Sequence, residues 1–173
     1  SDLSLAGLSL ASGIIGTEPE AAAEEAPATE PAAEPEPEPE FWTNGDIADS
    51  ASTAITGSSG DSFVGYTAAS TAAATSALTN VGKGYGKAAT FNMSAGGNNY
   101  FVAGDDAARS GGSIAYTGGS GNDSLTFGDD LAYDDGTATF DMSAGGNNTF
   151  VAGSSAASSG SLSYTGGSGN DSL

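Results

Sequence analysis

The sequence contains neither cysteine nor histidine. Without cysteine there is no disulfide framework and no thiolate metal site, and without histidine the commonest zinc ligand and catalytic base are missing. Zinc chemistry and Ser-His-Asp or Cys-His catalysis therefore lose their usual participants. We expect no enzyme active site in these 173 residues.

Basic residues are also scarce. Lysine and arginine number 3 against 22 acidic residues, which gives a formal net charge of −19. Such a charge argues against nucleic acids and anionic membranes as partners. No apolar run reaches the roughly 18 residues of a membrane-spanning helix, so we predict no transmembrane segment. No positively charged region precedes the apolar start, so an intact secretory signal is not indicated.

The acidic residues are segregated by type. From Glu18 to Glu40 there are nine acids, all glutamate, and residues 17–40 also hold all six prolines of the chain. Repulsion between glutamates and the stiffness of proline predict an extended linker that cannot build a core. From Asp46 onward every acid is aspartate, whose short side chain suits tight turns and bound ions.

A glycine-rich motif occurs twice. Gly118 to Thr126 reads GGSGNDSLT, and the same letters recur from Gly166 to Leu173 without the ninth residue. The pattern fits the nonapeptide G-G-x-G-x-D-x-U-x, in which a glycine-rich turn wraps a calcium ion and one apolar residue points into a parallel β-solenoid. Glycine lets several carbonyl groups turn toward one ion, and aspartate adds charge. An ordinary Gly/Asn/Asp turn is the alternative, and the matching flanks of the two copies favour calcium.

The two copies resemble the RTX (hemolysin-type) calcium-binding repeats of proteins secreted by Gram-negative bacteria. The resemblance implies a β-roll-like fold, calcium (Ca2+) in the turns, export by a type I system and an extracellular or cell-surface location. It also implies a ligand set in each copy. These ligands would be Gly118, Gly119, Gly121 and Asp123 in the first copy, and Gly166, Gly167, Gly169 and Asp171 in the second.

A longer repeat sets the period of the chain. Residues 89–104 recur at 138–153, which is 49 positions later, and a column of Asn99, Asp123, Asn148 and Asp171 divides this distance into spacings of 24, 25 and 23. We therefore predict an all-β parallel β-solenoid with rungs of about 24 residues, each read as strand, turn, strand, turn. Two core rows are expected: Phe91, Ile114 and Phe140 in one, and Met93, Tyr116, Met142 and Tyr164 in the next.

Other turns carry weaker candidates for calcium binding. Asn99 and Asn148 stand where the RTX pattern has aspartate, and because an amide oxygen carries no charge they should bind weakly or form a hydrogen-bonded asparagine ladder. Asp61 lies in a shorter relative of the motif at 57–63. On the opposite edge the pairs Asp105–Asp106 and Asp129–Asp130 fall 24 apart. They would form a second calcium site or serve as solubilising turn residues.

The chain divides into three predicted parts. Residues 1–16 form an apolar N-terminal strand, which is a candidate assembly element, and residues 17–40 form the acidic linker. Residues 41–173 form the solenoid, irregular over 41–87 and regular over 88–173, and we expect it to continue beyond residue 173. Phe41 and Trp42 are expected to cap its first end. Residues 67–81 are left open between a short helix and a wide loop.

The expected function is structural. A calcium-stiffened solenoid would suit a subunit of a bacterial surface layer, filament or adhesive stalk, polymerising through the N-terminal strand and the solenoid ends. A cell-surface polysaccharide is a candidate partner. Two alternatives stay open: the repeat module of a larger secreted enzyme or toxin, and an ice- or carbohydrate-binding solenoid, which would need a flat face of regularly spaced threonines or aromatic residues.

Overall fold

The computed structural model describes residues 33–43, 47, 51–67 and 78–173, and the structural statements below concern these ranges. The chain divides into two compact units, Ser1–Glu34 and Pro35–Leu173, and all described strands belong to the second. The predicted apolar strand within residues 1–16, the first part of the linker and residues 68–77 lie outside the described residues.

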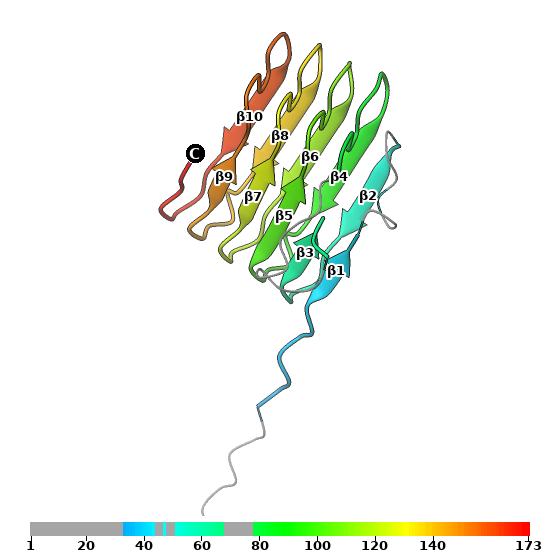
Figure 1. The fold of residues 1–173 in the computed structure, drawn as a ribbon. Coiled ribbons are helices and arrows are strands. Elements are labelled where there is room, and N and C mark those ends of the chain that lie inside the picture. Colours follow the sequence, from blue (N-terminus) through cyan, green and yellow to red (C-terminus); the bar gives the residue numbers. More distant parts are fainter. Residues whose placement is uncertain (1–32, 44–46, 48–50, 68–77) are drawn as a thin grey trace, which may run out of the picture. The chain divides into compact units, whose positions relative to one another are not determined.

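The second unit is a stack of parallel strands in two sheets (Figure 1). Neighbours in the first sheet follow the order β1-β3-β5-β7-β9, and neighbours in the second follow β10-β8-β6-β4-β2. Each circuit of the chain therefore adds one strand to each sheet, which confirms the predicted parallel β-solenoid. The strands are β1 (Glu40–Trp42), β2 (Thr53–Thr56), β3 (Ser62–Val64), β4 (Ala88–Asn92), β5 (Asn99–Ala103), β6 (Ser113–Thr117), β7 (Ser124–Phe127), β8 (Thr137–Asp141), β9 (Thr149–Val151) and β10 (Ser161–Thr165).

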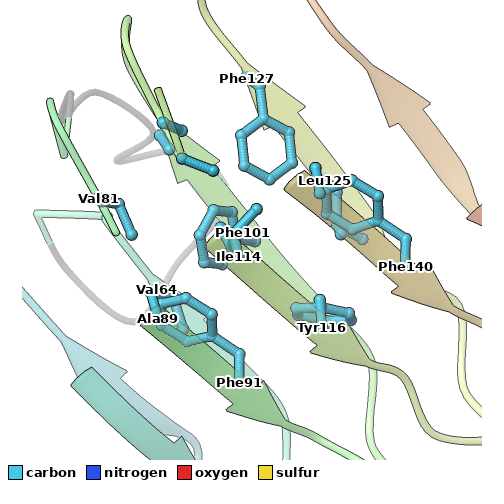
Figure 2. Close-up of a cluster of buried hydrophobic side chains, with 14 of the residues drawn as sticks. Val64, Val81, Ala89, Phe91, Phe101, Ile114, Tyr116, Leu125, Phe127 and Phe140 are labelled. Carbon is cyan, nitrogen blue, oxygen red and sulfur yellow. The ribbon is translucent and has the colours of Figure 1, made fainter. Parts of the chain in front are cut away.

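Side chains that alternate along the strands meet between the two sheets (Figure 2). From β4, β6 and β8 the buried row is Phe91, Tyr116 and Phe140, which lie in register. Phe101 of β5 faces this row, and its ring centroid lies 4.8 Å from that of Phe91 in an edge-on contact. The core is a single narrow seam of apolar side chains, so each rung is stabilised mainly by its two neighbours.

The predicted core rows were wrong by two residues in the two tyrosine rungs. Phe91 aligns with Tyr116 and not with Ile114, which instead pairs with Ala89 and Ala138. In the second predicted row, Tyr116 and Tyr164 both align with Phe140 and not with the methionines. The cause is the length of the following turn. The glycine-bearing rung takes one residue fewer than the methionine-bearing rung to reach the column of Asn99 and Asp123.

Methionine and glycine alternate at the position that follows each strand of the second sheet. A Cβ atom at Gly57 would lie 2.6 Å from the Sδ atom of Met93, and a Cβ at Gly118 would lie 2.6 Å from Sδ of Met142. The long thioether therefore fills the space that glycine leaves in the neighbouring rung. This alternation explains why the sequence repeats every second rung.

Strand β1 lies at the N-terminal end of the first sheet. It pairs with β3, with Phe41 opposite Phe63 and Trp42 opposite Val64, and Trp42 packs against the core. The end cap expected at Phe41 and Trp42 is therefore present as an added strand. It covers one edge of β3, which would otherwise expose unpaired backbone groups.

Candidate functional site: the ladders of the glycine-rich turns

The predicted column of asparagine and aspartate side chains lies at one edge of the solenoid and is joined by hydrogen bonds. The backbone N–H and the Nδ2 of Asn99 both donate to Oδ1 of Asp123, at 3.0 and 2.8 Å. The backbone N–H of Asp123 donates to Oδ1 of Asn148 at 2.9 Å, and Asn148 donates to Asp171 in the same manner. Asp123, Asn148 and Asp171 therefore each cap a backbone N–H of the preceding rung. We call this column the inner ladder.

A second column of side chains forms hydrogen bonds in the opposite direction along the stack. Oδ1 of Asp61 accepts the backbone N–H of Asn98 at 2.8 Å, and Oδ1 of Asn98 accepts that of Asn122 at 3.0 Å. The series continues from Asn122 to Asn147 and from Asn147 to Asn170. Each side chain of this outer ladder caps the following rung. This ladder was not predicted from the sequence, although an asparagine precedes each later inner-ladder residue.

The glycines of these turns allow the rungs to stack closely. A Cβ atom at Gly121 would collide with the backbone carbonyl oxygen of Gly97, one at Gly146 with that of Gly121, and one at Gly169 with that of Gly146. These carbonyl groups point along the stack toward the next glycine, where Cα–H contacts replace side chains. The glycines of the motif are therefore required by the stacking itself, whether or not an ion is bound.

Asp123 is the electrostatic centre of the inner ladder. Its side chain is buried, with 2 % of the residue exposed, and its Oδ2 atom has no hydrogen-bond partner. Burial raises the pKa of Asp123 to about 6, and the hydrogen bonds from Asn99 oppose that shift. Oδ1 of Asn99 is likewise buried and without a partner. Two oxygen atoms of adjacent rungs are therefore withdrawn from water, and the backbone N–H of Gly119, which lowers the pKa of Asp123, offsets that burial only in part.

A tyrosine accompanies the buried carboxylate. Burial raises the pKa of Tyr116 well above its ordinary value, and the charge of Asp123 raises it further. Its hydroxyl group is buried without a hydrogen-bond partner. Tyr164 and Asp171 repeat this pairing, whereas the asparagine rungs carry phenylalanine at the tyrosine position. Polar atoms are thus concentrated in the aspartate rungs.

Removal of the Tyr116 hydroxyl tests whether it has a partner. We expect Tyr116→Phe to raise the free energy of unfolding of the metal-free protein by about 1 kcal/mol, because an unsatisfied buried hydroxyl is lost and the ring is retained. Urea denaturation measures the change, with Tyr85→Phe as the control because Tyr85 is 92 % exposed. A loss of stability of similar size would show that the hydroxyl is hydrogen-bonded in the folded protein.

At the opposite edge, the predicted register of the aspartate pairs is confirmed. The backbone N–H of Asp129 donates to Oδ1 of Asp105 at 2.9 Å, and that of Ser154 donates to Oδ1 of Asp129 at 2.7 Å. Asp105 and Asp129 therefore cap the turns that follow them. Asp106 and Asp130 both have a positive φ, which aspartate adopts more readily than most residues.

Basic side chains of the chain contact the second member of each pair. Lys83 Nζ lies 2.7 Å from Asp106, while Arg109 lies 2.6 Å from Asp106 and 3.2 Å from Asp130. Hydrogen bonds from Lys83 and then Arg109 lower the pKa of Asp106. The guanidinium group also lies 4.9 Å above the ring of Tyr133. These two carboxylates are already partly neutralised by the protein.

No three acidic side chains gather in one place within the ranges that the structure describes. A cation at the inner ladder would therefore depend on amide and backbone oxygens in addition to a carboxylate. In the same ranges no helix has the length and apolar character needed to cross a bilayer. Comparisons with protein-family models, with curated proteins and with solved structures found no match.

Proposed function

We propose that the chain is a structural solenoid module of an extracellular or cell-surface protein, and that calcium binds at its aspartate-bearing turns. The observation that carries the calcium part is the Asp123 carboxylate, which is buried with its Oδ2 atom unpartnered. Burial disfavours the charged form, and a divalent cation would offset that cost by holding the group ionised. The resemblance of GGSGNDSLT to RTX repeats points to the same ion.

The residues of the Asp123 turn fit calcium in their donor type. The free atoms are a carboxylate oxygen of Asp123 and an amide oxygen of Asn99, both hard donors of the kind that calcium prefers. Asp171 accepts the same two hydrogen bonds from Asn148 and would supply its carboxylate in the last described rung, whereas Oδ1 of Asn148 already accepts the N–H of Asp123. We do not extend the proposal to Asp106 and Asp130, because Lys83 and Arg109 already bind them.

A structural role is supported by the way the rungs are built. Side-chain ladders on both edges, alternating methionine and glycine, and one aromatic row produce a regular stack whose length grows with each rung. The same stack would serve a surface layer, a stalk or the repeat region of a larger secreted protein. An ice-binding face has no support, because the outward row of Thr90, Ala115 and Thr139 is interrupted by alanine.

Calcium titration of the metal-free 173-residue chain tests the proposal. We expect calcium to raise the melting temperature, because an ion bound only by the folded state stabilises it, by about 2.7 kcal/mol per site at about 100 times Kd. The chain is first freed of metal with a chelator, and circular dichroism then follows thermal unfolding as calcium is added. The controls are sodium and magnesium chloride at matched ionic strength. Equal shifts with all three salts would refute ion-dependent stabilisation.

A further inference from the structure

The first complete rung lacks the inner-ladder carboxylate that the later glycine rungs contain. Its glycine is Gly57, which aligns through Met93 with Gly118, so it belongs to the same class of rung as the one that holds Asp123. At the inner-ladder position, however, it has Ser62, which is fully buried and whose hydroxyl has no hydrogen-bond partner. Without an added group, its turn would leave a backbone N–H uncapped.

A glutamate from the end of the acidic linker reaches this turn. Glu40 is the first residue of β1 and pairs in register with Ser62, so it occupies the next position of the inner ladder. Its Oε2 atom accepts the backbone N–H of Ser58 at 2.7 Å. The position of Ser58 after Gly57 matches that of Gly119 after Gly118, and the N–H of Gly119 faces the carboxylate of Asp123.

The position of the carboxylate is also matched. Oε2 of Glu40 lies 3.6 Å from the place where a Cβ atom at Gly57 would stand, and a carboxylate oxygen of Asp123 lies against the corresponding place at Gly118. Glutamate is one methylene longer than aspartate, which suits a side chain that starts one rung away. The chain thus places a carboxylate on the same side of two equivalent turns. Asp123 supplies it from within its own rung, and Glu40 supplies it from the neighbouring strand β1.

Backbone contacts hold the end of the linker in place. The N–H of Glu40 donates to the carbonyl of Asp61 at 2.8 Å, and the N–H of Gly65 donates to the carbonyl of Trp42 at 2.9 Å. A Cβ atom at Gly60 would lie 2.7 Å from the carbonyl oxygen of Glu38, so only glycine at this position lets the turn lie this close to the linker. The segment from Glu38 to Trp42 is therefore docked along the first turn and along β3.

We propose that residues 38–42 form a strap that closes the N-terminal end of the solenoid, and that Glu40 supplies in cis the carboxylate that the first rung lacks. The acidic linker is then joined to the solenoid at a fixed register, and its last glutamate acts as a positioning residue of the first turn. The inference does not depend on calcium, because every contact that carries it lies within the protein.

A double-mutant cycle in chelator tests the strap. We expect Glu40→Ala to lower the melting temperature by about 3–6 °C, because the N–H of Ser58 loses a charged acceptor. The matched control is Glu38→Ala, which removes the same charge from an exposed side chain two residues away and should shift the melting temperature by less than about 1 °C. Ser62→Asp should lower the melting temperature of the wild-type chain, because it places a second carboxylate beside that of Glu40.

In the Glu40→Ala background the same Ser62→Asp change should raise the melting temperature, because the carboxylate is then supplied from within the rung, as it is by Asp123. This reversal of sign is the result that a generally destabilising substitution cannot produce. Equal effects of Glu40→Ala and Glu38→Ala, or the same sign for Ser62→Asp in both backgrounds, would overturn the proposal.

Amide hydrogen exchange gives a second readout that tolerates a poorly folding variant. In the wild-type chain the amide of Ser58 should be protected, and Glu40→Ala, which removes the acceptor, should reduce its protection at least tenfold while Glu38→Ala leaves it unchanged. Unaltered protection in Glu40→Ala would contradict the strap. Sedimentation of the wild-type chain as a monomer supports the contact in cis, whereas a dimer that the Glu40→Ala change dissociates would show strand exchange between two copies and overturn that part.

Discussion

Replacement of Asp123 by asparagine should raise the free energy of unfolding of the metal-free protein at pH 7 by up to about 3 kcal/mol. The estimate follows from the pKa of about 6 that burial imposes on this carboxyl group against an ordinary value of 3.8. Asparagine keeps the oxygen that accepts both N–H groups of Asn99, and it introduces no charge. Asn148 already occupies the same ladder position in the adjacent rung, so the shape is compatible.

The pH dependence of stability has a definite sign. Because the folded pKa of Asp123 is raised, its favourable contribution is complete below pH 4 and is lost as the pH rises through 6. The metal-free wild-type protein should therefore become more stable between pH 7 and pH 4.5, whereas Asp123→Asn should be nearly flat over that interval. Asp106 and Asp141, whose pKa values are lowered, act with the opposite sign only below about pH 4.

Calcium should reverse the order of stability of the wild-type protein and the Asp123→Asn variant. If the ion is held by the Asp123 carboxylate, wild type gains stability on calcium addition and Asp123→Asn loses the part of that gain that belongs to this turn. Urea denaturation at several pH values, with chelator and with calcium, measures both effects. The matched control is Asp135→Asn, an exposed turn residue with a positive φ that asparagine also adopts. Destabilisation of the metal-free protein by Asp123→Asn would contradict the argument.

The rung period could be read from the sequence because one column of side chains recurs at almost constant spacing. Asn99, Asp123 and Asn148 lie 24 and 25 residues apart, and each contacts the next. Along β6 (Ser113–Thr117) and β7 (Ser124–Phe127) the buried residues are the apolar ones, which alternate with small or polar residues in the sequence. The local sequence pattern was enough to predict the rungs wherever the residue at one position has the same structural role in every rung.

Contacts between rungs were harder to predict from the sequence. The error in the core rows arose because the turn after Tyr116 is one residue shorter than the turn after Phe91, and only the pairing of β4 with β6 reveals which residues align. The partner of Glu40 lies 18 residues away, in a rung whose inner-ladder residue is Ser62, and the sequence alone does not show that a linker glutamate reaches that rung. Burial of Asp123 was equally hidden, because the same letters would suit an exposed turn. The calcium sites remain predictions.

The largest loss of stability is expected for Gly121→Ala. The φ of Gly121 lies outside the left-handed region, so alanine is not opposed by its own backbone conformation there. Its Cβ, however, would collide with the carbonyl oxygen of Gly97, and backbone atoms of a stacked rung cannot move aside as a flexible side chain can. Because rungs are separated by only about 4.8 Å, the local pairing of β5 with β7 must open. We expect a loss of about 3 kcal/mol or more.

Gly86→Ala provides a control of opposite character. Gly86 has a φ of +72° and no atom within 4 Å of a Cβ added there, so alanine suffers backbone strain without a collision. That strain should cost about 1 kcal/mol. Denaturation in urea compares the two variants. A smaller effect of Gly121→Ala than of Gly86→Ala would contradict the stacking argument.

The dependence of the Gly121→Ala effect on calcium separates the two roles that glycine can have in this motif. If glycine is needed only to aim carbonyl groups at an ion, the variant should match wild type in chelator and differ from it only when calcium is present. If glycine is needed because rungs stack carbonyl to Cα, the loss should appear in full in chelator. The contact between Gly121 and Gly97 predicts the second result, since no side chain fits between these rungs under either condition.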